Sequence, residues 1–116
     1  MEEKSVSIKN INTVVKIWGH DNIALKKGLA QEKKSVLILH GWGSNSDRWI
    51  EVAEAISKNG CQVIVPDLPG FGKSDPLQTP WNTNQYIEWI DELISQFGLK
   101  NFYLMGHSFG GALASK

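Results

Sequence analysis

The sequence predicts an α/β fold, in which helices flank a mostly parallel sheet that begins with two antiparallel strands. Two segments near the start, residues 5–8 and 13–18, are rich in alternating and β-branched residues, as half-buried strands are. Further along, continuous apolar runs such as residues 35–39 are typical of strands buried on both faces. Helical patterns separate these runs, and an alternation of strand and helix implies right-handed crossovers between parallel strands.

The first predicted helix follows the strand at residues 35–39. It starts at residues 44–47, where Ser, Asn, Ser and Asp are all good helix caps. Four apolar residues then recur at helical spacing, namely Trp49, Val52, Ala53 and Ile56. We expect Gly60 to end this helix as its C′ residue, because glycine adopts the left-handed conformation at little cost. Residues 62–65 form the next strand, which Pro66 ends.

The second predicted helix covers residues 82–97. Asn82, with Gln85 three residues later, has the pattern of a capping box, and Gly98 ends the helix. Residues 102–105 are again continuously apolar and predict a further buried strand. Glycines follow this strand, and we expect a last helix near residues 112–114.

The composition limits the classes of function. A chain of 116 residues makes one small domain, and 12 basic against 12 acidic residues argue against binding to nucleic acid or to an anionic membrane. The single cysteine, Cys61, forms no disulfide within the chain and no cysteine zinc site, which favours a reducing compartment. We find no signal peptide and no apolar run long enough for a membrane span. We therefore expect a cytoplasmic protein.

Three loops follow the predicted buried strands, at the sheet edge where α/β proteins carry their chemistry. After the last strand, Gly-x-Ser-x-Gly at residues 106–110 matches a nucleophile elbow, a tight turn that lifts the Ser108 hydroxyl clear of the sheet. His-Gly-Trp-Gly at residues 40–43 leaves backbone N–H groups accessible, and such groups can hold a negative oxygen. The candidate donors are the amides of Trp42 and Phe109. The third loop, residues 67–75, is rich in turn residues.

In type, order and approximate spacing, these three loops resemble the N-terminal part of an α/β-hydrolase fold protein of the serine hydrolase type. The resemblance implies that Ser108 is the nucleophile, that Trp42 and Phe109 donate to the oxyanion, and that Asp67 with its glycine loop is structural. It implies no metal and no organic cofactor. A serine at position 108 argues against haloalkane dehalogenases and epoxide hydrolases, which use aspartate at that place in the same fold.

The chain departs from this family after the elbow. In the family the triad acid and histidine follow the serine, yet only eight residues follow Ser108 and none of them is Asp, Glu or His. His40 and His107 belong to the predicted loops, and we do not expect either to be the base. We expect residues 1–116 to be a single incomplete domain that is inactive alone. The complete protein would transfer an acyl group from a small ester, thioester, lactone or related carbonyl substrate to water.

Two other functions are compatible with parts of the pattern. The first is a non-catalytic protein that keeps the hydrolase fold as a binding or receptor scaffold. The second is a dinucleotide-binding domain, because Gly41, Gly43 and Ser46 have nearly the spacing of a phosphate-binding turn and Asp67 follows the next strand. The serine at the third position and the two antiparallel leading strands argue against this second function.

Overall fold

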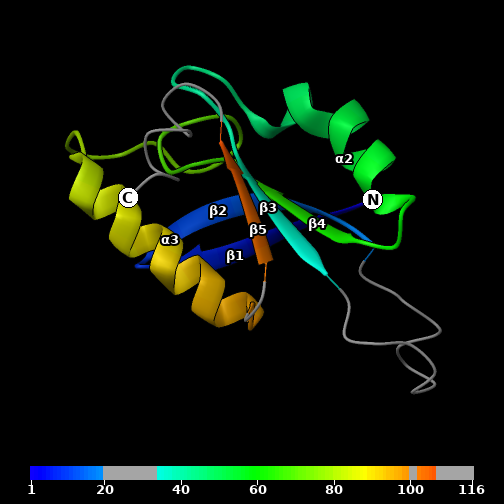
Figure 1. The fold of residues 1–116 in the computed structure, drawn as a ribbon. Coiled ribbons are helices and arrows are strands. Elements are labelled where there is room, and N and C mark those ends of the chain that lie inside the picture. Colours follow the sequence, from blue (N-terminus) through cyan, green and yellow to red (C-terminus); the bar gives the residue numbers. More distant parts are fainter. Residues whose placement is uncertain (20–33, 100–101, 107–116) are drawn as a thin grey trace.

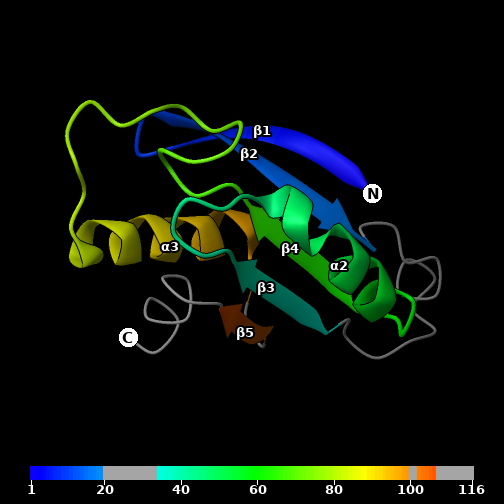
Figure 2. The ribbon, with the colours of Figure 1, turned by 90° about the horizontal axis from the view of Figure 1, so that it is seen from above.

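The structure, a computed structural model, describes residues 1–19, 34–99 and 102–106. These residues form one sheet with strand order β1-β2-β4-β3-β5. Helix α3 covers one face of the sheet, and a short 3₁₀ helix, η1, leads into α2 on the other face (Figure 1 and Figure 2). The elements are β1 (Glu2–Ile8), β2 (Ile11–Trp18), β3 (Ser35–Leu39), η1 (Ser46–Trp49), α2 (Ile50–Ser57), β4 (Gln62–Pro66), α3 (Thr83–Phe97) and β5 (Phe102–Gly106).

The strand pairing confirms the predicted fold class. β4, β3 and β5 are parallel neighbours, and β1 pairs with β2 in the predicted antiparallel hairpin. β2 also lies antiparallel to β4, which joins the hairpin to the parallel strands. Lys9 and Asn10 form the hairpin turn with φ angles of 52° and 65°. Two consecutive positive φ angles are the mark of a two-residue type I′ turn, whose twist matches that of the strands it joins.

The sheet separates two hydrophobic cores, and β3 contributes to both because its side chains alternate. Leu37 and Leu39 pack on the α3 side, whereas Val36 and Ile38 pack on the α2 side. The core on the α3 side is the larger and includes the fully buried Trp89. This double burial explains why β3 is continuously apolar in the sequence.

The helix α3 has the predicted ends. The Asn82 side chain accepts from the Gln85 N–H at 2.9 Å, and the Gln85 side chain accepts from the Asn82 N–H at 2.8 Å, so the capping box is complete. Gly98 follows in the left-handed conformation at φ 64°. The end predicted for the first helix is wrong by one residue, because Asn59 and not Gly60 is the C′ residue that follows the C-cap. α2 is capped by Lys58, since i to i+3 hydrogen bonds tighten the chain there before Gly60 reverses it at φ 86°.

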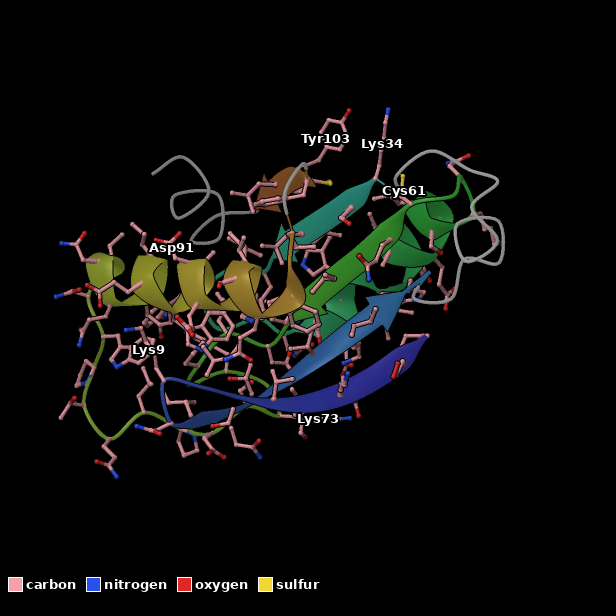
Figure 3. The ribbon with its side chains drawn as sticks, turned by 90° about the horizontal axis from the view of Figure 1, so that it is seen from below. Lys9, Lys34, Cys61, Lys73, Asp91 and Tyr103 are labelled. Atoms are coloured by element: carbon pink, nitrogen blue, oxygen red, sulfur yellow. The ribbon has the colours of Figure 1, made fainter. Side chains whose placement is uncertain are left out.

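The strand β5 forms as predicted, but it is exposed rather than buried. Among the described strands it pairs with β3 alone, at the edge of the sheet. Tyr103, Leu104 and Met105 are 59%, 38% and 38% exposed. Figure 3 shows Tyr103 at this edge, and Lys73 near β1 at the opposite edge. A strand of this composition is buried only when it has neighbours on both sides and covered faces.

Candidate active site

Two of the predicted loops begin side by side at one edge of the sheet. In the parallel register of β3 and β5, Leu39 lies opposite Gly106. Leu39 is the last residue before the loop at residues 40–46, and Gly106 is the first residue of the elbow motif. Ser108 and Phe109 lie outside the described residues, as does the predicted helix at residues 112–114. Of the three candidate site residues, the structure therefore describes Trp42.

Trp42 lies in a tight turn directly after β3. The Ser44 N–H donates to the Gly41 carbonyl at 3.0 Å, which closes the turn around Trp42 and Gly43. Gly43 has φ 72°, the positive value that the third residue of a type II turn requires. A Cβ atom at Gly43 would meet no atom within 4 Å, so backbone conformation rather than space demands glycine there.

His40 joins the two loops that follow β3 and β4. It is fully buried, its Nδ1 lies 2.8 Å from the Gly41 carbonyl, and its Nε2 accepts from the Leu68 N–H at 3.0 Å. Nδ1 must therefore donate, which assigns the neutral tautomer with its proton on Nδ1. Burial lowers the pKa of His40, outweighing the hydrogen bond to Gly41 and the charge of Asp67. Both ring nitrogens are engaged, in agreement with the expectation that His40 is not the catalytic base.

Asp67 organises the loop after β4. It is buried, its Oδ1 accepts from the Ser46 N–H at 2.7 Å, and its Oδ2 accepts from the Lys73 N–H at 3.1 Å. Gly72 leaves room for the carboxylate, because a Cβ atom there would lie 2.5 Å from the Asp67 Cγ. These contacts give Asp67 the structural role that the family resemblance implies.

The same contacts contradict the dinucleotide alternative. In a dinucleotide fold the phosphates bind the first N–H groups of the helix that follows the glycine turn. Here the carboxylate of Asp67 accepts from the first of these, the Ser46 N–H, at 2.7 Å. The Asn45 side chain accepts from the next, the Asp47 N–H, at 2.9 Å. The Asp67 carboxylate and the Asn45 side chain thus occupy the N–H groups at the start of the helix that a phosphate would bind.

Phe71 is a site residue that the sequence analysis missed. Its ring packs edge-on against Trp42, with centroids 4.9 Å apart, and against His40, with centroids 5.5 Å apart. Trp42 nevertheless stays 65% exposed at this edge of the sheet. The only sequence signal was an aromatic residue between two glycines of a loop, which does not reveal its neighbour. Phe71 braces the Trp42 loop from the side of β4.

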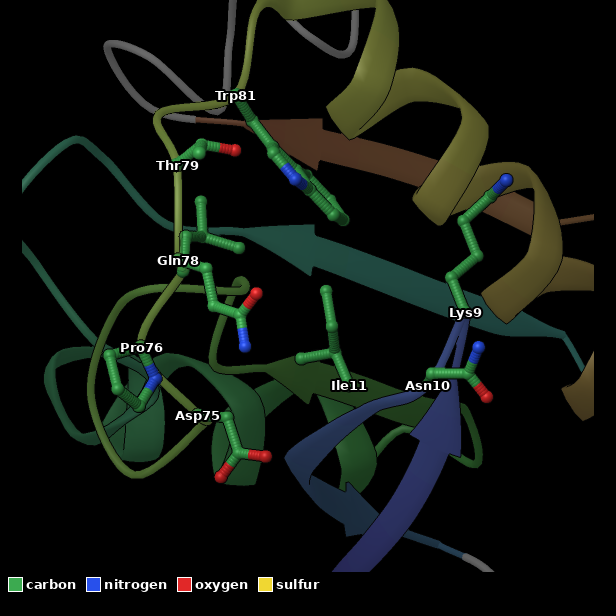
Figure 4. A pocket seen from close by; sticks show the side chains of 9 residues that line it. Lys9, Asn10, Ile11, Asp75, Pro76, Gln78, Thr79 and Trp81 are labelled. Carbon is green, nitrogen blue, oxygen red and sulfur yellow. The ribbon is translucent and has the colours of Figure 1, made fainter.

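A pocket of about 420 Å³ lies apart from these residues, between the hairpin turn and the loop before α3. Figure 4 shows Trp81 and Ile11 on opposite walls of this pocket, pointing toward each other. Trp42, the candidate residue that the structure describes, does not line it. Within the described ranges there is no group of three or more His, Cys, Asp or Glu side chains that could hold a metal ion. No helix in the same ranges is long and apolar enough to cross a membrane.

Comparison with known sequences finds relatives that are named as hydrolytic enzymes or as similar to them. A proline iminopeptidase of Lactobacillus delbrueckii subsp. lactis is 33% identical over 92 residues, which are 75% of this chain and 31% of that protein. A serine hydrolase-like protein of Dictyostelium discoideum is 29% identical over 118 residues, which cover 98% of this chain and 30% of that protein. The chain spans about a third of the length of these relatives.

Solved structures are similar over nearly the whole chain. A bacterial membrane phospholipase A has a TM-score of 0.80 and 25% identity, covering 97% of this chain and 33% of its own. Epoxide hydrolase from Vigna radiata has a TM-score of 0.81 at 24% identity, a likeness of fold, covering 97% of this chain and 33% of its own. The family described as alpha/beta hydrolase fold matches residues 34–116, more than half of the chain. The chain therefore belongs to the α/β-hydrolase fold family.

Proposed function

We propose that these residues belong to a serine hydrolase that transfers an acyl group to water. Ser108 is the nucleophile, and the backbone N–H groups of Trp42 and Phe109 hold the oxyanion. The observation that supports this best is the register of Leu39 opposite Gly106. Because of this register, the Trp42 turn and the elbow motif begin at the ends of neighbouring strands. A reaction that uses groups from both loops requires this arrangement.

The reaction follows from the chemistry of the three groups. The Ser108 Oγ attacks the substrate carbonyl carbon while a histidine accepts its proton, and the carbonyl oxygen becomes negative. The two backbone N–H groups bind this oxygen more strongly than the carbonyl from which it forms. Collapse of the intermediate expels the leaving group, which takes the proton from the histidine, and water then cleaves the acyl enzyme by the same steps.

The histidine and its orienting carboxylate come, in this proposal, from residues that follow Lys116 in the complete protein. The chain matches about a third of each relative, which supports an N-terminal part of a larger hydrolase domain. The relatives, among them a proline iminopeptidase, support a small-molecule substrate. The half-buried Cys61, the single cysteine, supports a reducing and cytoplasmic location.

A fluorophosphonate probe tests the nucleophile, because it reacts with serines that a base activates. We expect rapid labelling of the full-length protein, none after Ser108→Ala, and none of residues 1–116 alone. Ser57→Ala is the control and should leave labelling unchanged, since the Ser57 hydroxyl makes an exposed hydrogen bond to the Glu54 carbonyl of the same helix, α2. An unlabelled full-length protein would contradict the proposal and favour the non-catalytic scaffold.

A further inference from the structure

The strand β2 carries a lysine in the interior of the protein. Lys16 is 2% exposed, and lysine is almost never so buried without partners for its charge. Its Nζ donates to the Ser46 Oγ at 2.6 Å and lies 2.8 Å from the Asp47 Oδ1 and 3.3 Å from the Glu3 Oε1. The three N–H bonds of the ammonium group thus meet three acceptors, one from β1 and two from η1.

The partner Ser46 is held at two atoms. Its backbone N–H donates to Asp67 Oδ1 at 2.7 Å, while its side-chain oxygen accepts from Lys16. Ser46 is fully buried and is the first residue of η1, at the end of the loop that carries Trp42. The hairpin and the loop after β4 therefore converge on the residue where the Trp42 loop ends.

The Trp42 loop is fastened at both of its ends and closed by a turn between them. At the β3 end, the His40 ring bonds the Gly41 carbonyl and the Leu68 N–H. At the other end, Lys16 and Asp67 bind Ser46. An oxyanion donor acts well only when it is aimed before the reaction, and a displacement near 1 Å can cost ~10²-fold in rate.

We propose that Lys16 is a positioning residue of this hydrolase: by holding Ser46 it fixes the end of the loop at residues 40–46 and so aims the Trp42 amide at the oxyanion. This inference rests on the proposed function and adds to it a residue from the N-terminal hairpin. Lys16 acts through Ser46 and does not itself touch the substrate.

The charges around Lys16 keep it an ammonium ion. The groups that face it are Glu3 on β1, Asp47 on η1 and Asp67 after β4, with Lys73 beyond Glu3. Burial disfavours the charged form, but the hydrogen bonds and charges of the three carboxylates outweigh burial and raise the pKa of Lys16. The contact to Ser46 is therefore present throughout the neutral pH range, and its removal should act equally at pH 6 and pH 9.

The test uses Lys16→Met in the full-length protein. Methionine removes the ammonium but leaves Asp47 and Glu3, whose side chains are 61% and 36% exposed, in contact with water. The buried Asp67 loses the nearby charge of Lys16 but keeps its hydrogen bonds from the Ser46 and Lys73 N–H groups. The readouts are kcat and KM for p-nitrophenyl acetate and the inhibition constant for phenylboronic acid. The boron of this inhibitor accepts an electron pair from the serine oxygen while the histidine takes the serine proton, and the tetrahedral boronate anion that forms resembles the tetrahedral intermediate of the substrate.

We expect Lys16→Met to lower kcat and weaken boronic acid binding by ~10-fold each, below the ~10²–10³ that loss of a whole donor costs, with KM within twofold. Lys73→Met is the matched control. Lys73 binds the same Glu3 with its side chain, at 3.1 Å, and meets Asp67 through its backbone N–H, which methionine keeps, so Lys73→Met should leave all three constants within twofold.

Different outcomes overturn different claims. Full activity and boronic acid affinity in Lys16→Met, or equal losses in both lysine variants, overturn the positioning role and leave the proposed function intact. A wild-type protein that neither hydrolyses the ester nor binds the boronic acid overturns the proposed function. If Lys16→Met fails to fold, Ser46→Ala tests the inference in its place, because this variant keeps the Lys16 ammonium and the carboxylates of Glu3 and Asp47. Unchanged kcat and boronic acid affinity in folded Ser46→Ala overturn the inference.

Discussion

The two edges of the sheet differ in the side chains they expose. Along β1 the exposed residues include Glu2, Glu3 and Lys4, and Glu3 pairs with Lys73 and Lys16. Along β5 the exposed residues are apolar. Charged side chains on an edge strand oppose pairing with another strand, whereas an apolar edge invites it. The β1 edge is built as an end of the sheet, and β5 has the composition of a strand with two neighbours.

The hairpin of β1 and β2 is tied to the loop after β4 by hydrogen bonds from β2, and we call this hairpin and loop the closed side of the sheet. Asn12 and Asp75 exchange two bonds, from the Asn12 N–H to the Asp75 side chain at 3.2 Å and from the Asp75 N–H to the Asn12 carbonyl at 2.9 Å. The Ser74 hydroxyl accepts from the Val14 N–H at 3.0 Å and donates to the Asp67 carbonyl at 2.6 Å. Contacts between distant segments therefore stabilise the closed side, whereas β5, among the described strands, pairs with β3 alone.

The largest expected effect concerns the open edge. Residues 1–116 alone should self-associate through β5 or remain partly folded, because within the described part of the chain no strand pairs with the outer side of β5 and its exposed side chains are apolar. Tyr103→Lys should reduce the associated fraction, and Lys4→Ala on β1 should change it little. Sedimentation velocity measures both. A monodisperse monomer with a sharp cooperative melt would contradict the difference drawn between the two edges.

A substitution at Gly72 tests the closed side. Gly72→Ala in the full-length protein places a Cβ atom 2.5 Å from the Asp67 Cγ at φ 54°, so the carboxylate must move off its two N–H donors. Gly43→Ala is the matched control, with φ 72° and no atom within 4 Å. Both substitutions should lower the free energy of unfolding by ~1–2 kcal/mol, because alanine disfavours the left-handed conformation. Gly72→Ala should lower it by a further ~1–3 kcal/mol through overpacking.

Urea denaturation of the two glycine variants measures this difference in the free energy of unfolding. Equal losses in the two variants would mean that Asp67 relaxes freely and that the contacts around it do not hold the closed side together.

The parts of the fold that depend on local signals were predictable from the sequence. The capping box of Asn82 and Gln85 and the glycine at position 98 locate both ends of α3. The apolar runs of β3 and β4 locate the parallel strands, and the order of the loops predicts that two of them share one edge. Ser108 and Phe109 stay predictions, because they lie outside the described residues.

The contacts that hold the candidate site were not predictable, because they join residues far apart in the chain. Lys16 and Ser46 are 30 positions apart, and Leu68 and His40 are 28 apart. A lysine within an apolar strand signals only that its charge needs a partner, and not which residue supplies one. For the same reason Phe71 and Lys16 appear in the site only once the chain is folded.

The last and smallest expected effect is a pH dependence of stability that arises at His40, where the closed side meets the Trp42 loop. Its pKa is lowered in the folded protein by burial, while the unfolded chain has the ordinary value of about 6.5. The unfolded state therefore binds more protons as the pH falls, so this contribution to stability is complete above about pH 6.5 and is lost below it. Protonation would also turn Nε2, which accepts from the Leu68 N–H, into a second donor. The urea midpoint of the full-length protein should decrease as the pH is lowered from 7.5 to 5.5. The midpoint of His40→Gln, which keeps a neutral donor and acceptor, should decrease less. The same pH slope in both proteins would show that the closed side does not depend on a neutral His40.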